Sequence, residues 1–489
     1  MKKYQLFIDG KWVDSVSGKT FTSINPATKE INGIIAEGDA ADIDLAVKAA
    51  RKAFESGPWA SMSPSERGRL LYRAAQKLWE NVDYLAEVES NDNGLTINET
   101  KLIAIPAAID VLEFYAGMAN KIQGDTLASP GNRFNYTLRE PVGVVGAIVP
   151  WNFPIMLTMW KLAPALAAGN TIVIKPAEQT PISVLELARL LQEAGIPDGV
   201  INVVNGYGPT AGAALASHPD VDKIAFTGST ATGRLIMQAA SKHLKPISLE
   251  LGGKSPNIVF DDADIDAAIS GSLFGIYFAQ GQVCAAGSRL FVQETIYDRF
   301  VEEFARKAES IRVGHPLDPN TQMGPQVSEE QLNIIERYVQ IGKQEGATLV
   351  TGGKRNEECG NGFYYTPTVF ADVDNNMTIA KEEIFGPVVS IIRFKDEEDA
   401  LKKANESIYG LASGVWTTNL ARAHRMARGL KAGTVYVNTF SMLDSAAPFG
   451  GMKQSGFGRE LGIEAMNMYT QTKHVWVDLS QEKFNWYGL

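Results

Sequence analysis

The pattern of apolar and polar positions predicts an α/β protein. The continuous apolar segment at residues 142–149 is typical of a buried strand, because a strand covered on both faces carries apolar side chains throughout. Residues 171–174, 201–204 and 223–226, which are mostly apolar, are predicted as the next strands. The segments between them show helical periodicity, for example over 230–241. This βαβα order predicts a doubly wound, Rossmann-like sheet.

The chain before this unit predicts a hairpin and two amphipathic helices. Residues 6–8 and 11–13 flank Asp9-Gly10, a strong signal for a two-residue turn. One helix is expected over 42–54. The other begins at Ser63-Pro64-Ser65-Glu66, a capping box with proline at the first helical position.

A second α/β unit is expected from Asn257 onward. Its strands include 388–393 and 434–437. Its helices are expected at four places, over residues 265–277, 296–311, 328–345 and 399–405.

Two segments do not belong to either unit. Residues 121–141 are interrupted by proline and glycine and end in an alternating strand pattern, and the tail from Tyr469 to Val477 alternates in the same way. The first segment is either an ordinary surface hairpin or a strand that needs a partner edge, on another subunit or on the tail.

Composition narrows the possible functions. The 489 residues are enough for two or three domains. The net charge of −10 argues against a nucleic-acid partner and against binding to anionic lipid. The apolar stretch 142–169 contains Lys161 and three prolines, so we do not expect it to span a membrane.

Two cysteines cannot build a disulfide framework, and the first ten residues have no apolar core long enough for a signal peptide, so none is expected. We therefore expect a reducing compartment and a cytoplasmic protein. Cys359 lies in a polar loop and is expected to be exposed and non-catalytic. Cys284 lies among small residues between Gly281 and Gly287. It is either a buried structural cysteine or an approachable nucleophile.

Several polar residues follow predicted strands, where α/β sheets bind ligands. Asn152, held between Pro150 and Pro154, is either a turn residue or a neutral donor for an oxyanion. Glu250 ends an apolar strand. It is either a water-facing edge residue or a buried general base with a raised pKa.

Lys175 and Glu178 suit the hydroxyls of an adenosine ribose, but these two residues alone favour the interpretation of a solvated charge pair. The segment 228–233 lacks the middle glycine of the dinucleotide fingerprint. The five histidines are scattered, and neither a metal site nor a Cys–His pair is predicted.

Taken together, these motifs closely resemble the NAD(P)-dependent aldehyde dehydrogenases of the hydrolytic type. The resemblance covers nearly the whole chain. Seven segments match in order: 150–154, 175–178, 226–233, 250–256, 281–289, 382–388 and 448–456.

The resemblance implies a mechanism. Cys284 would attack the aldehyde, with the oxyanion held by the Asn152 amide and the Cys284 backbone N–H. Glu250 would activate the water that hydrolyses the thioester. Lys161 would lie near the oxyanion site, and Glu460 would belong to a proton path. Cys284 is therefore expected within a few ångströms of the Asn152 amide, with Glu250 at water-bridging distance.

The resemblance also implies sites for cofactor and substrate. NAD is expected rather than NADP, because Glu178 would repel a 2′-phosphate. The cofactor would be bound by Trp151, Lys175, Glu178, Gly228, Ser229, Gly252, Glu383 and Phe385. The aldehyde tunnel would be lined by Phe153, Met156, Trp160, Phe274, Phe278, Val283, Ala285, Leu443 and Phe449.

This apolar tunnel implies medium aliphatic or aromatic aldehydes (the general activity EC 1.2.1.3). The alternatives are betaine aldehyde, a CoA-acylating relative, or a non-enzymatic binder on the same scaffold. The implied domains are an NAD-binding domain (1–120 and 142–251), a catalytic domain (252–454) and a small β arm (121–141 and 464–489). The arm implies a homo-oligomer, a tetramer rather than a dimer.

Overall fold

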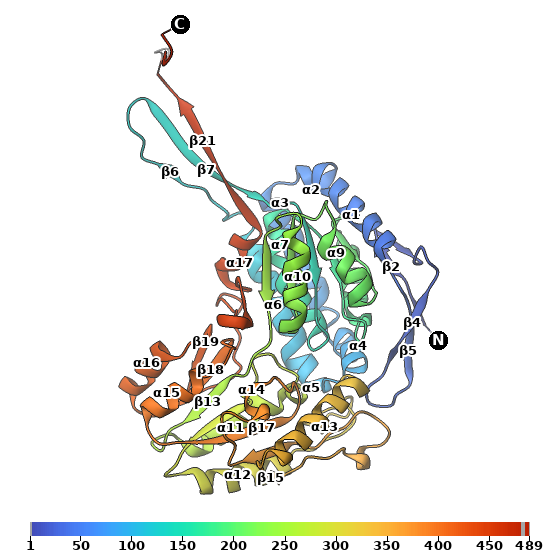
Figure 1. The fold of residues 1–489 in the computed structure, drawn as a ribbon. Helices are drawn as coiled ribbons and strands as arrows, with labels where there is room; N and C mark the ends of the chain where they lie inside the picture. The colour runs from blue at the N-terminus through green and yellow to red at the C-terminus, as the bar shows by residue number, and fades with distance from the viewer. Residues whose placement is uncertain (1, 481–484, 489) are drawn as a thin grey trace.

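The computed structural model describes residues 2–480 and 485–488. Two α/β lobes lie one above the other, and a long β arm projects from them (Figure 1). Each lobe is built on one large, mostly parallel sheet. The α/β class and the Rossmann-like order predicted from the sequence are therefore confirmed.

The first lobe contains an eight-stranded sheet. Its five central strands are parallel, because the chain crosses over through helices between them. The strand order is β20 (Gly456–Phe457), β12 (Ile247–Glu250), β11 (Lys223–Thr227), β8 (Val144–Ile148), β9 (Thr171–Lys175), β10 (Ile201–Val203), β2 (Leu6–Ile8) and β3 (Lys11–Val13).

Helices cover both faces of this sheet and make two apolar clusters. One face carries α3 (Pro64–Trp79), α4 (Val82–Asn93), α6 (Ile105–Met118), α7 (Pro154–Ala168) and α8 (Ile182–Glu193). The other carries α1 (Ala40–Glu55), α9 (Ala213–Ser217) and α10 (Thr230–Ser241). The hairpin at Asp9-Gly10 and the Ser63 capping box are present as predicted. The short helix α2 (Pro58–Ser61) links α1 to α3.

Residues 82–118 were not assigned from the sequence. The structure places α4 there, then α5 (Ile97–Glu99) and a π-helical turn, η1 (Thr100–Ala104), before α6. The connection between β10 and β11 also begins as a π-helical turn, η2 (Gly208–Gly212), before α9. The two glycines of η2 are consistent with this irregular start, because glycine disfavours a regular α-helical turn.

The second lobe contains a seven-stranded sheet that is parallel except for its edge strand β15. The strand order is β15 (Thr348–Thr351), β16 (Thr368–Ala371), β17 (Val388–Phe394), β14 (Arg289–Gln293), β13 (Pro256–Val259), β18 (Ala412–Trp416) and β19 (Thr434–Val437). It is covered by α11 (Ile265–Tyr277), α12 (Tyr297–Glu309), α13 (Glu329–Gln344), α14 (Thr378–Lys381), α15 (Glu397–Asn405) and α16 (Leu420–Gly429). The strands and long helices predicted for this unit are confirmed.

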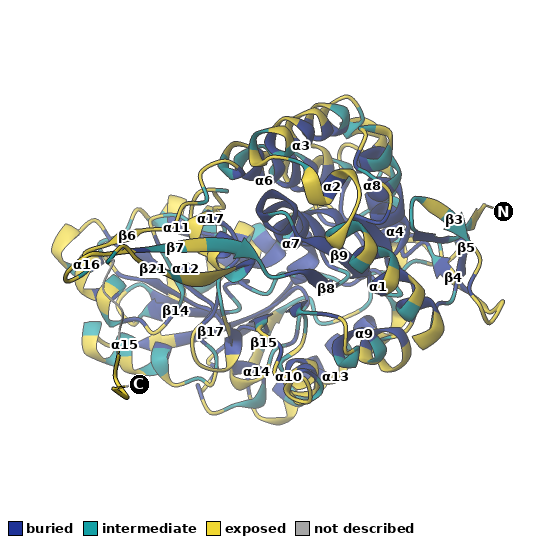
Figure 2. Cartoon of the chain, turned by 90° about the horizontal axis from the view of Figure 1, so that it is seen from above, coloured by how far each residue is buried: buried dark blue, intermediate teal, exposed yellow. Residues whose placement is uncertain are grey.

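The arm joins the two segments that stood apart in the sequence. Strand β7 (Arg133–Pro141) pairs with β6 (Thr126–Leu127) and, over nine residues, with the tail strand β21 (Thr470–Asp478). The tail segment therefore pairs with the segment 121–141 of the same chain. The arm stays largely exposed while the sheet strands are buried (Figure 2).

A third, small sheet of β1 (Lys3–Tyr4), β5 (Ile31–Ala36) and β4 (Thr20–Ile24) lies beside the first lobe, and α17 (Gly462–Met468) leads into β21. In residues 2–480 and 485–488, no helix has the length and apolar character needed to cross a membrane.

Candidate active site

Two cavities meet at Cys284. The first, of about 220 Å³, lies at the carboxyl ends of β8, β11 and β12. The second, of about 330 Å³, lies between α7, α11 and the segment 441–449. Asn152, Leu157 and Cys284 line both cavities, so a molecule in either one can reach the sulfur.

The turn before Cys284 requires close packing of backbone. Residues Phe278–Gly281 form a short 3-10 turn, η3. Gly281 has φ +72°, and a Cβ there would lie 2.2 Å from the carbonyl oxygen of Gly386. A Cβ on Gly253 would lie 2.4 Å from the Cys284 carbonyl oxygen. Glycine at 253 lets the segment after Glu250 pack directly against Cys284, and glycine at 281 lets the cysteine turn pack against the backbone at Gly386.

The environment of Cys284 favours the protonated thiol over the thiolate. Burial, followed by the charges of Glu383 and Glu250, raises the pKa of the thiol to about 12, while the backbone N–H groups of Ala285 and Cys284 act in the opposite direction. A thiolate is the reactive form, so a nearby base or cation must assist the deprotonation of Cys284.

Asn152 is buried just before α7, in the turn after β8. Its side-chain Nδ2 donates to the carbonyl oxygen of Gln282 at 2.9 Å, which ties it to the cysteine turn. An amide nitrogen carries two hydrogens, so one donor is left for a ligand in the cavities that Asn152 and Cys284 share. The simple turn interpretation is therefore incomplete.

Glu250 is the last residue of β12, which lies between β11 and β20. The alternative of a water-facing edge residue is wrong, because the side chain is buried and both of its oxygens lack a hydrogen-bond partner. Burial, then the charge of Glu460, raises the pKa of Glu250 well above its usual range. A carboxyl of this kind suits proton transfer near neutral pH.

Lys161 and Glu460 form a buried ion pair behind Glu250. Lys161 Nζ donates to Glu460 Oε1 at 2.7 Å and to Thr227 Oγ1 at 2.6 Å. Neither residue lines the two cavities. The pair contributes to the electrostatic environment of Glu250, because Lys161 lowers and Glu460 raises its pKa.

The smaller cavity carries most of the residues expected to bind a cofactor. Trp151, Gly228, Ser229, Gly252, Glu383 and Phe385 all line it. Glu383 Oε1 accepts the Gly253 N–H at 2.9 Å, and Phe385 packs edge-on against Trp151 with ring centroids 5.2 Å apart. Ser229 caps α10 by accepting the Thr232 N–H at 3.1 Å, which leaves free N–H groups at a helix start, as an anion site requires.

Lys175 and Glu178 do not line this cavity. Lys175 ends β9 and is buried, and its Nζ lies 3.1 Å from Glu178 Oε2. The pair is therefore half-buried rather than solvated.

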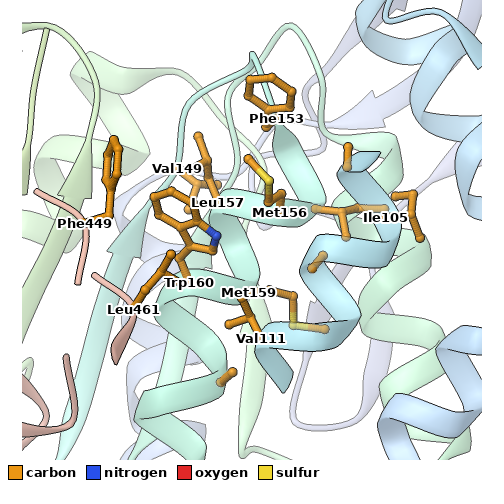
Figure 3. Close-up of a cluster of buried hydrophobic side chains, with 14 of the residues drawn as sticks. Ile105, Val111, Val149, Phe153, Met156, Leu157, Met159, Trp160, Phe449 and Leu461 are labelled. Carbon is orange, nitrogen blue, oxygen red and sulfur yellow. The ribbon is translucent and has the colours of Figure 1, made fainter. Parts of the chain in front are cut away.

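All nine residues expected in the aldehyde tunnel line the larger cavity. Trp160 on α7 faces Phe449, with ring centroids 5.2 Å apart, and Phe153 lies at the start of the same helix (Figure 3). Phe274 and Phe278 stack on the other side at 4.9 Å. Among the described residues, none of those that line this cavity carries a charge.

The sequence interpretation missed several lining residues. Leu102, Ile103 and Ala107 come from η1 and α6, Tyr436 comes from β19, and Ser441 and Met442 come from the loop after β19. Gln331 and Leu157 were missed as well. No strand-end motif marks these positions, and the segment with Leu102 had not been assigned.

Cys359 is partly buried, and its thiol donates to the Val313 carbonyl at 3.3 Å. The expectation that it is exposed is wrong, because the loop folds into a short 3-10 turn against the chain at Val313. Within the described residues there is no group of three or more His, Cys, Asp or Glu side chains able to hold a metal ion.

Two parallel sheets with a thiol between a polar and an apolar cavity are the features of a two-lobed α/β enzyme. The family model named "Aldehyde dehydrogenase family" matches residues 12–475. The Bacillus subtilis protein DhaS is 54% identical over 475 residues, 97% of this chain and 96% of that protein. Human mitochondrial aldehyde dehydrogenase is 51% identical over 98% of this chain and 92% of its own.

A solved NAD⁺ complex of the Bacillus cereus aldehyde dehydrogenase superimposes with a TM-score of 0.97 at 48% identity, covering 98% of this chain and 97% of that one. The chain belongs to the aldehyde dehydrogenase family. It is accordingly an oxidoreductase that acts on aldehydes.

Proposed function

We propose that the protein oxidises an aldehyde to its carboxylic acid with NAD as hydride acceptor, through covalent adducts on Cys284. The observation that carries the proposal is that one thiol lines both a polar and an apolar cavity. Such a thiol can bind the aldehyde carbon from one side while a cofactor reaches the same carbon from the other.

The first bond forms between Cys284 Sγ and the aldehyde carbon. The thiol proton goes to the ionised form of Glu250, because its raised pKa makes this carboxylate a stronger base than an ordinary one. The aldehyde oxygen becomes an oxyanion, which accepts from the second hydrogen of Asn152 Nδ2 and from the Cys284 backbone N–H. NAD, when bound, supplies the acceptor for the hydride that leaves this carbon.

The acyl group is then a thioester on Cys284. After Glu250 has released the thiol proton to solvent, it removes a proton from water. The water oxygen bonds to the acyl carbon, the S–C bond breaks, and the proton taken from water returns to the sulfur. The net change converts aldehyde, NAD⁺ and water into carboxylic acid, NADH and a proton. Lys161 and Glu460 form the adjacent charged path through which the proton on Glu250 leaves.

The residues of the smaller cavity fit NAD. A Cβ on Gly252 would lie 2.2 Å from Glu383 Oε2, so the two residues form one surface, and Glu383 presents a carboxylate suited to ribose hydroxyls. Solved relatives hold NAD⁺, which supports this cofactor. The charge of Glu178 disfavours a 2′-phosphate. We expect kcat/KM to be higher with NAD than with NADP. A Glu178→Gln variant should have a smaller ratio of kcat/KM with NAD to kcat/KM with NADP.

A CoA-acylating enzyme is the nearest alternative chemistry. Such an enzyme does not need a base to activate water, whereas Glu250 is buried with two unpartnered oxygens beside the thiol-bearing cavity. Formation of NADH should therefore need no CoA. Strict dependence of NADH formation on CoA would refute the hydrolytic proposal.

The uncharged lining of the larger cavity supports medium aliphatic or aromatic aldehydes. This lining fits a cationic substrate such as betaine aldehyde less well, because it has no anionic side chain, although Trp160 and Phe449 offer aromatic faces. Comparing kcat/KM for hexanal, benzaldehyde, phenylacetaldehyde and betaine aldehyde tests this. A preference for betaine aldehyde would overturn the substrate class while leaving the chemistry intact.

The exposed arm of β6, β7 and β21 supports a homo-oligomer, for which we propose a tetramer. Two unpaired cysteines favour a reducing compartment such as the cytoplasm. The domain limits expected from the sequence also stay a proposal. Sedimentation of the purified chain tests the oligomeric state.

A further inference from the structure

The turn that carries Cys284 contains two residues in an unfavourable backbone conformation. Ala279 has φ 51° and ψ 38°, and Gln280 has φ 56° and ψ 25°. Neither is glycine, and both are fully buried. A left-handed conformation is costly for residues with a Cβ and persists only where surrounding contacts hold it. Something outside the turn must therefore stabilise it.

The stabilising contacts come from residues 94–99. Glu99 Oε1 accepts the Ala279 N–H at 2.8 Å, and the Gly94 carbonyl accepts Gln280 Nε2 at 2.8 Å. The second oxygen of Glu99 accepts both the N–H and the hydroxyl of Thr96. Each of the two left-handed residues thus has one buried hydrogen bond to the same short segment.

The same segment also reaches the oxyanion residue. Asn93 Nδ2 donates to the backbone carbonyl of Asn152 at 3.1 Å, and Asn152 Nδ2 donates to the carbonyl of Gln282. Gln282 Nε2 donates to Gln280 Oε1 at 3.4 Å, and Gln280 Nε2 donates to the Gly94 carbonyl. These bonds close a ring that contains Asn152 and ends two residues from Cys284.

We propose that Gln280 and Glu99 are positioning residues that hold the cysteine turn so that its sulfur, its backbone N–H and the Asn152 amide face one point. The proposal rests on the proposed function, in which these three groups act on one aldehyde. Neither Gln280 nor Glu99 lines the two cavities, so they act through the turn and do not touch substrate.

The decisive variant is Gln280→Met in a Cys359→Ser background, where Cys284 is the single thiol. Methionine matches the length of glutamine but cannot donate to Gly94. We expect kcat to fall about 10–100-fold, with KM for NAD unchanged. Alkylation of Cys284 by iodoacetamide should slow, and its pH profile should move to higher pH, because the N–H groups that lower the thiol pKa no longer face the sulfur.

A second pair covers the case in which Gln280→Met does not fold. Glu99→Gln keeps an oxygen that accepts the Ala279 N–H, whereas Glu99→Leu does not. The glutamine variant should retain the alkylation rate to within about threefold, and the leucine variant should lose about tenfold. Equal rates in these two variants would overturn the role of Glu99.

Asn202→Ala is the matched control. Asn202 is a fully buried amide on β10 whose Nδ2 donates to the Gly199 carbonyl at 2.8 Å, remote from the turn in the fold. It should leave the alkylation profile unchanged. If the control slows alkylation as much as Gln280→Met does, or if Gln280→Met matches the parent in kcat and alkylation, the proposal is wrong.

Because the alkylation assay needs no aldehyde, it distinguishes a failure of the proposed function from a failure of the positioning role. A parent protein that does not oxidise aldehydes would refute the proposed function. A shifted alkylation profile in Gln280→Met would still support the positioning role.

Discussion

The two cavities at Cys284 are built in opposite ways. The smaller one is lined by backbone glycines and by polar side chains at strand ends, with Glu250 buried and Glu383 partly buried. The larger one is lined by aromatic and aliphatic side chains from α7, α11, η1 and the loop after β19. The cavity with the carboxylates and the cavity with the aromatic rings share the Cys284 sulfur and the Asn152 amide in their linings.

This difference separates chemistry from specificity. The polar cavity raises the pKa of the thiol and of Glu250 and supplies fixed donors, so changes there should alter rate with any aldehyde. No charged side chain lines the apolar cavity. Substitutions there should therefore alter which aldehydes the protein prefers. Each prediction below tests one side of this division.

The largest effect is expected from Cys284 itself, which belongs to both cavities. Cys284→Ser should lower kcat for every aldehyde by about 10⁴-fold or more, as for other removed nucleophiles, because a hydroxyl is a far weaker nucleophile than a thiolate. NADH formation under steady-state conditions measures it. Binding of NAD, followed by fluorescence quenching, should be retained, and residual activity near that of the parent would assign the chemistry to another group.

Next in size is the loss of the amide donor. Asn152→Ala should lower kcat about 10²–10³-fold for short and long aldehydes alike, as for other oxyanion donors. Asn152→Asp has the same size but no N–H, and it should be at least as slow. An aspartate variant close to the parent in kcat would mean that packing, and not donation, is what Asn152 provides.

The pH dependence tests the polar cavity without a mutation. Because burial and Glu460 raise the pKa of Glu250, and burial raises that of the thiol, the ionised forms of both groups increase as pH rises. We expect kcat to increase as the pH rises above the usual range of carboxyl pKa values, by at most about tenfold per pH unit for one proton. A flat or falling profile with saturating substrates would contradict the base role of Glu250.

The smallest effect is expected at the rim of the apolar cavity. Phe274 is 40% exposed and stacks on Phe278. Phe274→Ala should lower kcat/KM for hexanal about tenfold. It should leave kcat/KM for acetaldehyde and KM for NAD unchanged. Phe457→Ala, a 43% exposed phenylalanine on β20 outside both cavities, is the control. Equal losses for both aldehydes would mean that the rim affects rate and not selection.

The same division explains what the sequence could predict. Asn152, Glu250 and Ser229 stand at or just after strand ends, where apolar strand patterns locate them and ligands of α/β sheets bind. Glu250 is buried because β20 covers its strand, a pairing between distant segments that no local pattern reveals.

The contacts that hold the cysteine turn were beyond sequence reasoning. Asn93, Gly94 and Glu99 bond to atoms 59, 186 and 180 residues away, and most of these bonds end on backbone atoms, which carry no residue identity. The aldehyde tunnel was foreseen only through the family resemblance, and its residues on η1 were missed because a π-helical turn breaks the usual helical period.

The central claim is that hydride transfer leaves an acyl group on Cys284 that Glu250 then releases to water. Rapid mixing of Glu250→Gln protein with hexanal and NAD, followed by acid quench and mass spectrometry, tests it directly. Because Glu250 also accepts the thiol proton, we expect the first NADH to form more slowly than in the parent but to reach about one per chain. A hexanoyl adduct should then be found on the peptide that contains Cys284, with slow release. Continued turnover at the parent rate, or a burst with no adduct on that peptide, would contradict the account.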